Sequence, residues 1–190
     1  MAKVIVSISM SLDGFIAGPN ISAKQPMGEG GERIHNWMFK TKTEIDASVI
    51  NEIWETSGAV IVGGRTYTIA IDDAWGGASP FSIPAFVLIH TVPDKKVNGF
   101  TYITEGIEQA LLQATIATGA KNIWVMGGAD TIGQFLNAKM IDELQINLVN
   151  VLLGGGVRLF DTINTGQIEL EKQRVIDSAG VTHLKYRVIK

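Results

Sequence analysis

The fold of this chain is decided by residues 121–136, KNIWVMGGADTIGQFL. The apolar run 123–126 is typical of a strand covered on both faces, and Ile132 and Phe135 follow at helical spacing. Between them, Gly127-Gly128 lets the backbone turn sharply and leaves the N–H groups of the helix N-terminus open to an anion. On this stretch alone, a phosphate site and a tight turn that binds nothing are equally good interpretations.

Bulk composition predicts one globular domain, residues 1–190, because 46% of the residues are apolar and only 18% are charged. The net charge is −3, and scattered lysines and arginines argue against nucleic acid or a membrane surface as a partner. The absence of cysteine excludes disulfides, thiolate metal ligands and a cysteine nucleophile. Since the N-terminus lacks a signal-like apolar region and no apolar run approaches the ~20 residues of a membrane helix, we expect a cytoplasmic protein. No metal site is expected, because the histidines lack metal-ligand spacing.

Strands and helices alternate up to residue 130, and only strands follow, which predicts an α/β fold with a mostly parallel sheet and a C-terminal antiparallel hairpin. The expected strands are 3–10, 59–62, 85–89, 100–103, 145–153 and the hairpin 167–189. Thr43 and Thr104 are expected to cap helices. Ile45, Val49, Ile53 and Trp54 are expected on the buried face of the first of these helices. The glycine-rich loop 20–32 is expected to be mobile.

A second strand–glycine–helix junction occurs at Gly63-Gly64, followed by Arg65 and Thr66. Ligands of open α/β sheets bind at the carboxyl ends of strands, so the two junctions favour a diphosphate-bearing nucleotide. Alternatively, Arg65 is an ordinary solvated arginine. A Walker A loop is excluded because Gln134-Phe135 stands where Lys-Ser/Thr is needed, and no G-x-G-x-x-G follows the first strand.

Candidates for acid–base catalysis are few. Asp13 lies in a turn directly after the first strand, where either catalysis or an Asx-type turn explains it. His183 falls on the polar side of the last strand and is expected to be exposed. Trp75 is either a substrate-stacking ring or an aromatic residue of a surface loop. With so few groups, the chemistry is expected to reside in a bound cofactor, as in hydride transfer.

Five motifs carry a family resemblance, in family order across nearly the whole chain. They are MSLDGFIA at 10–17, VGGRTY at 62–67, VMGG at 125–128, IDEL at 141–144 and LLGGGVRLF at 152–160. The chain resembles the dihydrofolate reductase-like superfamily, and most closely the C-terminal reductase domain of the bifunctional riboflavin-biosynthesis deaminase-reductase. The resemblance implies a three-layer α/β/α fold, NADPH as hydride donor, a pterin- or aminopyrimidine-like substrate and a homodimer formed through the terminal hairpin. The zinc signature of the deaminase half is absent.

The resemblance also assigns residues by position. For the cofactor, these are Ser9, Ile16 and Ala17 at the nicotinamide, Gly63, Gly64, Arg65 and Thr66 at the first phosphate turn, His90 and Thr91 at the 2′-phosphate, and Met126, Gly127, Gly128, Ala129, Asp130 and Thr131 at the second glycine turn. Asp13 is the candidate catalytic residue, and Leu12, Gly14, Trp37 and Trp75 would border the substrate.

One departure from the family concerns the acid. Dihydrofolate reductases carry a carboxylate on the first helix, and aligning Trp37 with the aromatic residue of that helix places Ile34 there, with Glu32 nearby. Other functions therefore stay open: a nucleotide-binding module without turnover, a true dihydrofolate reductase, or a flavin- or phosphosugar-binding enzyme.

Overall fold

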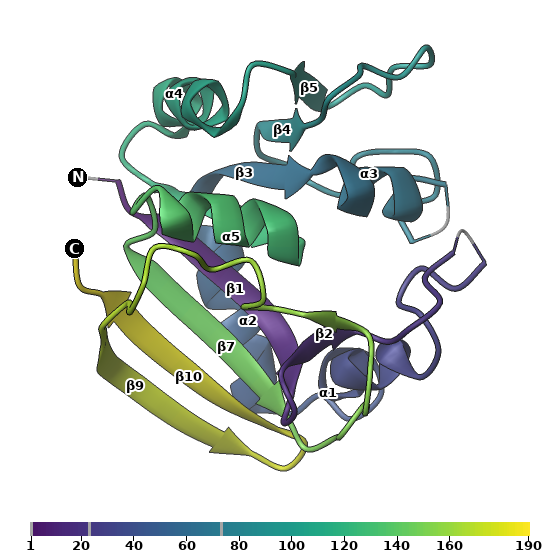
Figure 1. Cartoon of the computed structure of the whole chain (residues 1–190), viewed down its shortest axis with the longest axis vertical. Helices are drawn as coiled ribbons and strands as arrows, with labels where there is room; N and C mark the ends of the chain where they lie inside the picture. The colour runs from purple at the N-terminus through teal and green to yellow at the C-terminus, as the bar shows by residue number, and fades with distance from the viewer. Residues whose placement is uncertain (1, 23, 73) are drawn as a thin grey trace.

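The structure, a computed structural model, describes residues 2–22, 24–72 and 74–190 and contains a central mixed sheet (Figure 1). Within these residues the sheet has eight strands in the order β5-β4-β3-β6-β1-β7-β10-β9. Their bounds are β1 Val4–Ser11, β3 Ser57–Gly63, β4 Ala85–Leu88, β5 Phe100–Ile103, β6 Asn122–Gly127, β7 Glu143–Val149, β9 Leu170–Ser178 and β10 Val181–Val188. In this order, all strands from β5 through β4, β3, β6 and β1 to β7 are parallel, whereas β10 and β9 add an antiparallel hairpin. A small separate sheet pairs β2 (Phe15–Ala17) with β8 (Val157–Arg158).

Helices cover both faces of this sheet, which confirms the three-layer α/β/α fold. Helices α4 (Ile107–Thr118) and α5 (Ala129–Asn137) pack on one face, and α5 lies in front of β1 in Figure 1. The opposite face is covered by the 3₁₀ helix η1 (Gly31–His35), α1 (Asn36–Phe39), α2 (Glu44–Thr56) and α3 (Gly64–Ala70). Among the described residues, none of the helices combines the length and the apolar character needed to cross a membrane.

The face beneath α4 and α5, which we call the apolar face, holds the larger core. Alternate residues of β1 and β6, such as Val6 and Val125, are completely buried there against Ile132 and Phe135 of α5. Burying an aliphatic or aromatic side chain of this kind contributes about 1.5–3 kcal/mol. This face therefore supplies much of the stability of the fold.

The opposite face of the same strands is polar over part of its width. We call Ser7 and Ser9 of β1, Gln145 and Asn147 of β7, and His183 of β10 the polar row. Ser7 pairs with Gln145, Ser9 with Asn147, and Asn147 with His183, so these side chains share one face. All but Ser7 are more than nine-tenths buried. The row is thus an internal polar surface rather than a solvated one.

The predicted helix caps and the predicted buried face of α2 are confirmed only in part. Thr43 caps α2 as predicted, in a reciprocal capping box with Asp46. Val49 and Ile53 are buried, but Ile45 and Trp54 are 47% and 37% exposed, so the predicted buried face of this helix was too wide. Thr104 was predicted to cap α4, but the N-cap of this helix is Gly106. The backbone N–H of Thr104 instead donates a hydrogen bond to the Glu105 carboxylate.

The loop 20–32 was predicted to be mobile, but the described part of it is bonded to the segment before it. Gly18 donates to the Met27 carbonyl over 2.8 Å, and Glu29 donates to the Pro19 carbonyl over 2.8 Å. Gly28 has a φ of 70°, and a Cβ there would lie 2.3 Å from the Gly18 carbonyl oxygen. Only glycine fits that close approach. The glycines of this loop therefore allow tight packing.

Candidate active site

The carboxyl ends of the central strands open into a cleft of about 1470 Å³, lined also by residues of α2, α3 and α5. Every residue that the family resemblance assigned to the cofactor lines this cleft. They are Ser9, Ile16, Ala17, Gly63, Gly64, Arg65, Thr66, His90, Thr91, Met126, Gly127, Gly128, Ala129, Asp130 and Thr131. The sheet order explains the convergence, because β4, β3 and β6 are neighbours and the segments that follow them leave at the same edge.

The two glycine junctions lie against each other. A Cβ on Gly63 would lie 2.3 Å from Thr131 Oγ1 and 3.1 Å from the Gly127 carbonyl oxygen. A Cβ on Gly128 would lie 3.3 Å from Thr66 Oγ1, and Gly127 has a φ of 120°. The glycines therefore serve two purposes: a sharp turn at Gly127, and close contact between junctions that are far apart in sequence.

This paired junction has the chemistry of an anion site. Helix α5 begins directly after Gly128, and its first N–H groups and positive dipole end face the cleft edge. The exposed guanidinium of Arg65 adds a cation. Asp130, in the first turn of α5, adds a negative charge. Its carboxylate accepts a hydrogen bond of 2.8 Å from Gln134. That carboxylate disfavours an anion directly beside it.

His90 and Thr91 follow β4 and are exposed along the cleft. They lie close to the first junction, since a Cβ on Gly64 would meet Leu88 and Ile89 at about 3 Å. Residues at the ends of two adjacent parallel strands are thus brought together, as predicted.

At the other end of the cleft, Trp37 and Ser9 are in direct contact. Trp37 Nε1 donates to Ser9 Oγ over 3.0 Å, and the indole is only 2% exposed. Trp37 lines the cleft as predicted, but most of its ring is packed in the core with Ile34 and Val149. Its main effect is to orient the Ser9 hydroxyl.

The contacts of Asp13 do not fit its predicted catalytic role. Its carboxylate accepts hydrogen bonds from Ser11 Oγ (2.6 Å), Leu153 N (3.1 Å) and Gly154 N (2.7 Å). These bonds, that from Ser11 above all, lower the pKa of Asp13 to about 2. Such a carboxyl is ionised at neutral pH and cannot donate a proton. Asp13 instead ties the turn after β1 to the glycine run at 154–156.

The neighbours of Asp13 share this placement. Leu12, 63% exposed, donates its backbone N–H to the Val151 carbonyl, and Gly14 closes the turn onto the Ser11 carbonyl. Leu12, Asp13 and Gly14 are not among the described residues that line the cleft. The structure thus places these three residues in the turn beside the cleft, and not among the residues that line it.

Trp75 was predicted to be either a substrate-stacking ring or an aromatic residue of a surface loop, and the structure shows features of both. Its ring is half-buried, lines the cleft, and stacks on Phe100 with centroids 5.8 Å apart. Phe81 and Tyr67 complete the aromatic cluster at 5.6 Å and 6.5 Å. Trp75 thus anchors its loop by aromatic packing, at the edge of the cleft.

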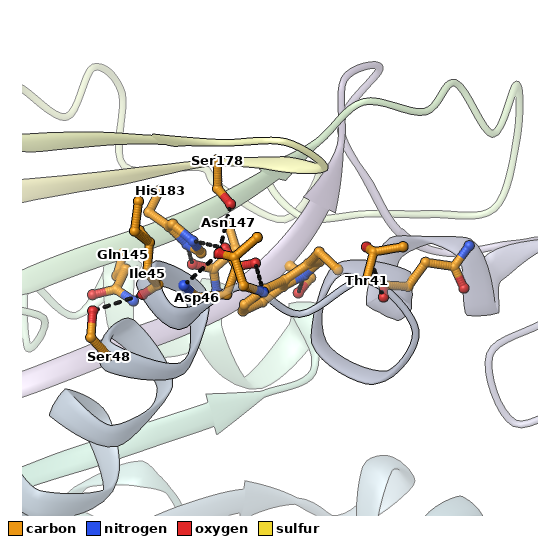
Figure 2. Close-up of polar contacts among 12 residues, drawn as sticks. Thr41, Ile45, Asp46, Ser48, Gln145, Asn147, Ser178 and His183 are labelled. Atoms are coloured by element: carbon orange, nitrogen blue, oxygen red, sulfur yellow. Dashed lines mark hydrogen bonds and ion pairs between the residues drawn. The ribbon is translucent and has the colours of Figure 1, made fainter.

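His183 was predicted to be exposed, and this prediction was wrong. The side chain is 3% exposed, because α2 covers this end of β10. Figure 2 shows its ring between two polar partners: Nδ1 lies 2.7 Å from Asn147 Oδ1, and Nε2 lies 3.0 Å from Asp46 Oδ1. Trp37 contacts the ring edge-to-face at 5.0 Å.

Asp46, in the first turn of α2, contacts the polar row directly, since its Oδ1 lies 3.0 Å from His183 Nε2. Burial raises the pKa of Asp46, but hydrogen bonds from the Thr43 backbone, His183, Ser178 and the Thr43 side chain outweigh this effect and lower it overall. At neutral pH it is therefore a buried anion beside a histidine. Asp46 is not among the described residues that line the cleft, so it contacts the cleft only through His183 and Asn147.

Sequence reasoning missed further cleft residues: Gln145, Asn147, His35, Lys42 and Arg158. Gln145 and Asn147 alternate with Leu144, Ile146 and Leu148, and Ser7 and Ser9 alternate in the same way on β1. Polar residues at period two on strands in the middle of a covered sheet were the available signal. Burial lowers the pKa of His35, so its imidazole is neutral at neutral pH.

Arg158 links the cleft to the supporting turn. Its Nη1 donates to the Asp13 carbonyl over 3.0 Å, and its guanidinium carbon lies 4.3 Å from the centre of the Phe15 ring. The sequence signal was its place two residues after the glycine run at 154–156.

Comparisons with known proteins agree with this architecture. The chain is 26% identical over 183 residues to the uncharacterised protein YwjB of Bacillus subtilis (strain 168), covering 95% of this chain and 96% of YwjB. A putative riboflavin biosynthesis protein from Shewanella sp. PV-4 has a similar structure, with a TM-score of 0.78, 21% identity and 99% of each chain covered. Dihydrofolate reductase from Enterococcus faecalis, solved with NADP(H) and RAB-propyl, gives a TM-score of 0.66 at 14% identity, covering 99% of this chain and 97% of that one.

These likenesses confirm the dihydrofolate reductase-like fold. The family model described as the RibD C-terminal domain matches residues 2–183. The chain therefore belongs to the RibD C-terminal domain family.

Proposed function

We propose that this protein is an NADPH-dependent reductase that transfers a hydride to a C=N or C=O carbon of a pterin- or aminopyrimidine-like substrate. The observation that carries the proposal is the convergence of both glycine junctions, Arg65, His90 and Ser9 on one cleft. Membership of a family named for a riboflavin-pathway protein supports the reaction class.

The residues present fit NADPH. The start of α5, with Thr66 and Arg65, would hold the diphosphate, because it offers N–H groups, a hydroxyl and a guanidinium. His90 and Thr91 would lie at the adenosine 2′-phosphate, and Ser9, Ile16 and Ala17 at the nicotinamide amide. When bound, NADPH would supply the hydride, and the protein would orient the reactants and exclude water.

The substrate would occupy the end of the cleft between α2 and the polar row. Val49, Ile50 and Ile53 supply an apolar wall there, opposite Ser9 and Asn147. Asp13 is held as an anion by its hydrogen bonds, and Asp46 is paired with His183. A water molecule is thus the proposed source of the proton that completes the reduction.

Thermal melting with NADPH, NADH, FMN and ATP in parallel tests the cofactor. We expect NADPH to give the largest rise in Tm, since binding to the folded state stabilises it by mass action. Arg65→Ala should weaken NADPH binding roughly tenfold through the loss of one charge-assisted contact. Arg33→Ala, an exposed arginine outside the cleft, is the matched control. A melt unaffected by NADPH would overturn the proposal.

A second candidate is a nucleotide-binding module without turnover, which the engagement of Asp13 and Asp46 favours. Absorbance at the NADPH band separates the two candidates when the protein is mixed with pterins and aminopyrimidines. A Tm shift with no NADPH consumption across both substrate classes would support the module.

A further inference from the structure

Asn147 stands at the boundary between the buried polar network and the cleft. Its side chain is 4% exposed, and the residue lines the cleft. The amide oxygen faces His183 Nδ1 at 2.7 Å. Among the residues that the structure describes, none accepts a hydrogen bond from the amide nitrogen, and this nitrogen is not one of the fully enclosed unpaired atoms. The two N–H donors of Asn147 are therefore available to the cleft.

This amide is held in place by His183 and Asp46. His183 Nε2 lies 3.0 Å from Asp46 Oδ1, and its Nδ1 lies 2.7 Å from Asn147 Oδ1, so the ring is fixed between the carboxylate and the amide oxygen (Figure 2). Because the amide oxygen lies against the ring, the amide nitrogen is turned away from His183.

A second donor lies beside Asn147. Ser9 is its partner in the register of β1 and β7, and it also lines the cleft. Ser9 Oγ accepts the Trp37 indole N–H over 3.0 Å, which leaves the hydroxyl proton of Ser9 to donate. Two donors thus lie side by side on neighbouring strands, which are separated by roughly 4.8 Å.

We infer that Asn147 is a specificity-determining residue that, with Ser9, binds a ring carbonyl oxygen of the substrate, and that Asp46 and His183 hold its amide in the donating orientation. A carbonyl oxygen has two lone pairs for two donors, whereas a ring nitrogen has one and an amino group presents N–H groups of its own. The substrate class is therefore an oxo-heterocycle rather than its amino analogue. This inference rests on the proposed function for its assumption that the cleft holds a heterocycle.

The test uses two probes with the same ring, pterin and 2,4-diaminopteridine, which differ by an oxo or amino group at one carbon. Calorimetric titration of the full chain, with and without NADP⁺, should show that pterin binds roughly tenfold more tightly, because the amino probe leaves both donors unpaired. Asn147→Leu should bring the two affinities within about threefold of each other. Asn147→Asp, which presents an acceptor, should reverse the preference.

Asn150→Leu is the matched control, since Asn150 is exposed at the end of β7 and does not line the cleft. It should retain the wild-type preference. Equal binding of the two probes by the wild type, no binding of either, or an unchanged preference in Asn147→Leu would overturn the inference. Each result is read without NADPH turnover, so a failed Tm shift with NADPH refutes the proposed function separately.

His183 acts through Asn147, and His183→Gln tests this positioning role. Without the ring that fixes the Asn147 oxygen, the preference for pterin over 2,4-diaminopteridine should be weaker than in the wild type. The Tm of the variant, measured beside the two affinities, separates a loss of preference from a loss of fold.

The charged side chains Glu52 of α2, Glu143 of β7, Arg174 of β9 and Lys185 of β10 form, with Lys3, a separate ion-pair cluster. Glu52→Gln is the control for an effect of that cluster and should leave the preference unchanged. An unchanged preference in His183→Gln would remove the positioning role from His183.

Discussion

The two faces of the central sheet are built from the same strands, yet they differ in kind. Beneath α4 and α5, alternate residues of β1, β6 and β7 are mostly apolar and are buried or partly buried. Beneath α2, the intervening residues include Ser7 and Ser9 of β1 and Gln145 and Asn147 of β7, and all of these but Ser7 are more than nine-tenths buried. Polar groups are costly to bury, so a protein that needed only stability would not place them there. One face thus stabilises the fold, whereas the other presents polar side chains to the cleft.

The largest effect is expected when a buried side chain of the apolar face is shortened, which tests whether this face stabilises the fold. Phe135 of α5 is 0% exposed, so Phe135→Ala should lower the free energy of unfolding by about 3–5 kcal/mol, through lost burial and a cavity. Ile116→Ala on α4, where the side chain is 75% exposed, should change it by less than about 0.5 kcal/mol. Urea denaturation monitored by circular dichroism measures both. Similar losses for the two variants would mean that α5 does not anchor the core.

Asp46→Asn tests the polar face with a smaller effect. Removing the buried charge that pairs with His183 should cost about 3 kcal/mol at neutral pH. Because the folded pKa of Asp46 lies below its ordinary value of 3.8, the contribution is complete above that value and is lost as the pH falls through the lowered folded pKa. The stability difference between wild type and variant should therefore shrink between about pH 5 and pH 2.

Asp94→Asn is the control, because Asp94 is exposed on a loop. Its stability should follow that of the wild type at every pH. A difference between wild type and Asp46→Asn that stays constant down to pH 2 would show that the Asp46 charge does not stabilise the fold.

Gly63→Ala tests the glycine junction at the edge where the two faces meet. The new Cβ would lie 2.3 Å from Thr131 Oγ1, so the two junctions must separate, at a cost of about 1–3 kcal/mol. NADPH binding should weaken in the same variant. Gly155→Ala is the matched control, because a Cβ there meets nothing within 4 Å. The Tm values of both variants are measured with and without NADPH. Equal values for the two variants would mean that the close contact between the junctions contributes neither to stability nor to NADPH binding.

The smallest effect on stability is expected at the end of the apolar face. We propose that the protein is a homodimer formed through the terminal hairpin, which forms the lower left edge of the sheet in Figure 1, and the neighbouring segment 148–153. Leu170 and Val175 of β9 are 43% and 49% exposed on this edge strand. Sedimentation should give twice the chain mass of 20.5 kDa, and Val175→Asp should give the single-chain mass with little loss of fold. A wild-type monomer at micromolar concentration would contradict the proposal.

Much of this molecule could be predicted from local patterns. The strand–glycine–helix junctions, the Thr43 cap and the terminal hairpin all follow from short-range physics: φ freedom, capping and period-two alternation. The convergence of Gly63, His90 and Gly127 on one edge follows from the topology of a parallel sheet. These features also carried the family resemblance, which is why the residues that line this part of the cleft could be predicted from the sequence.

What local patterns could not decide is which side of a strand is covered. His183, Asn147 and Asp46 are distant in sequence, and their local patterns do not connect them. Local sequence predicts an exposed side chain for His183, an alternating polar residue for Asn147 and an acid in the first turn of a helix for Asp46. Only the packing of α2 over β7 and β10 encloses them together and turns three ordinary residues into a bonded network. Asp13 is the converse case: its position after β1 left catalysis and an Asx-type turn open, and its hydrogen bonds with Leu153 and Gly154 keep the carboxyl ionised and favour the turn. Sequence determined the strands, turns and glycine junctions because those depend on neighbouring residues, whereas burial and charge pairing depend on which distant elements meet.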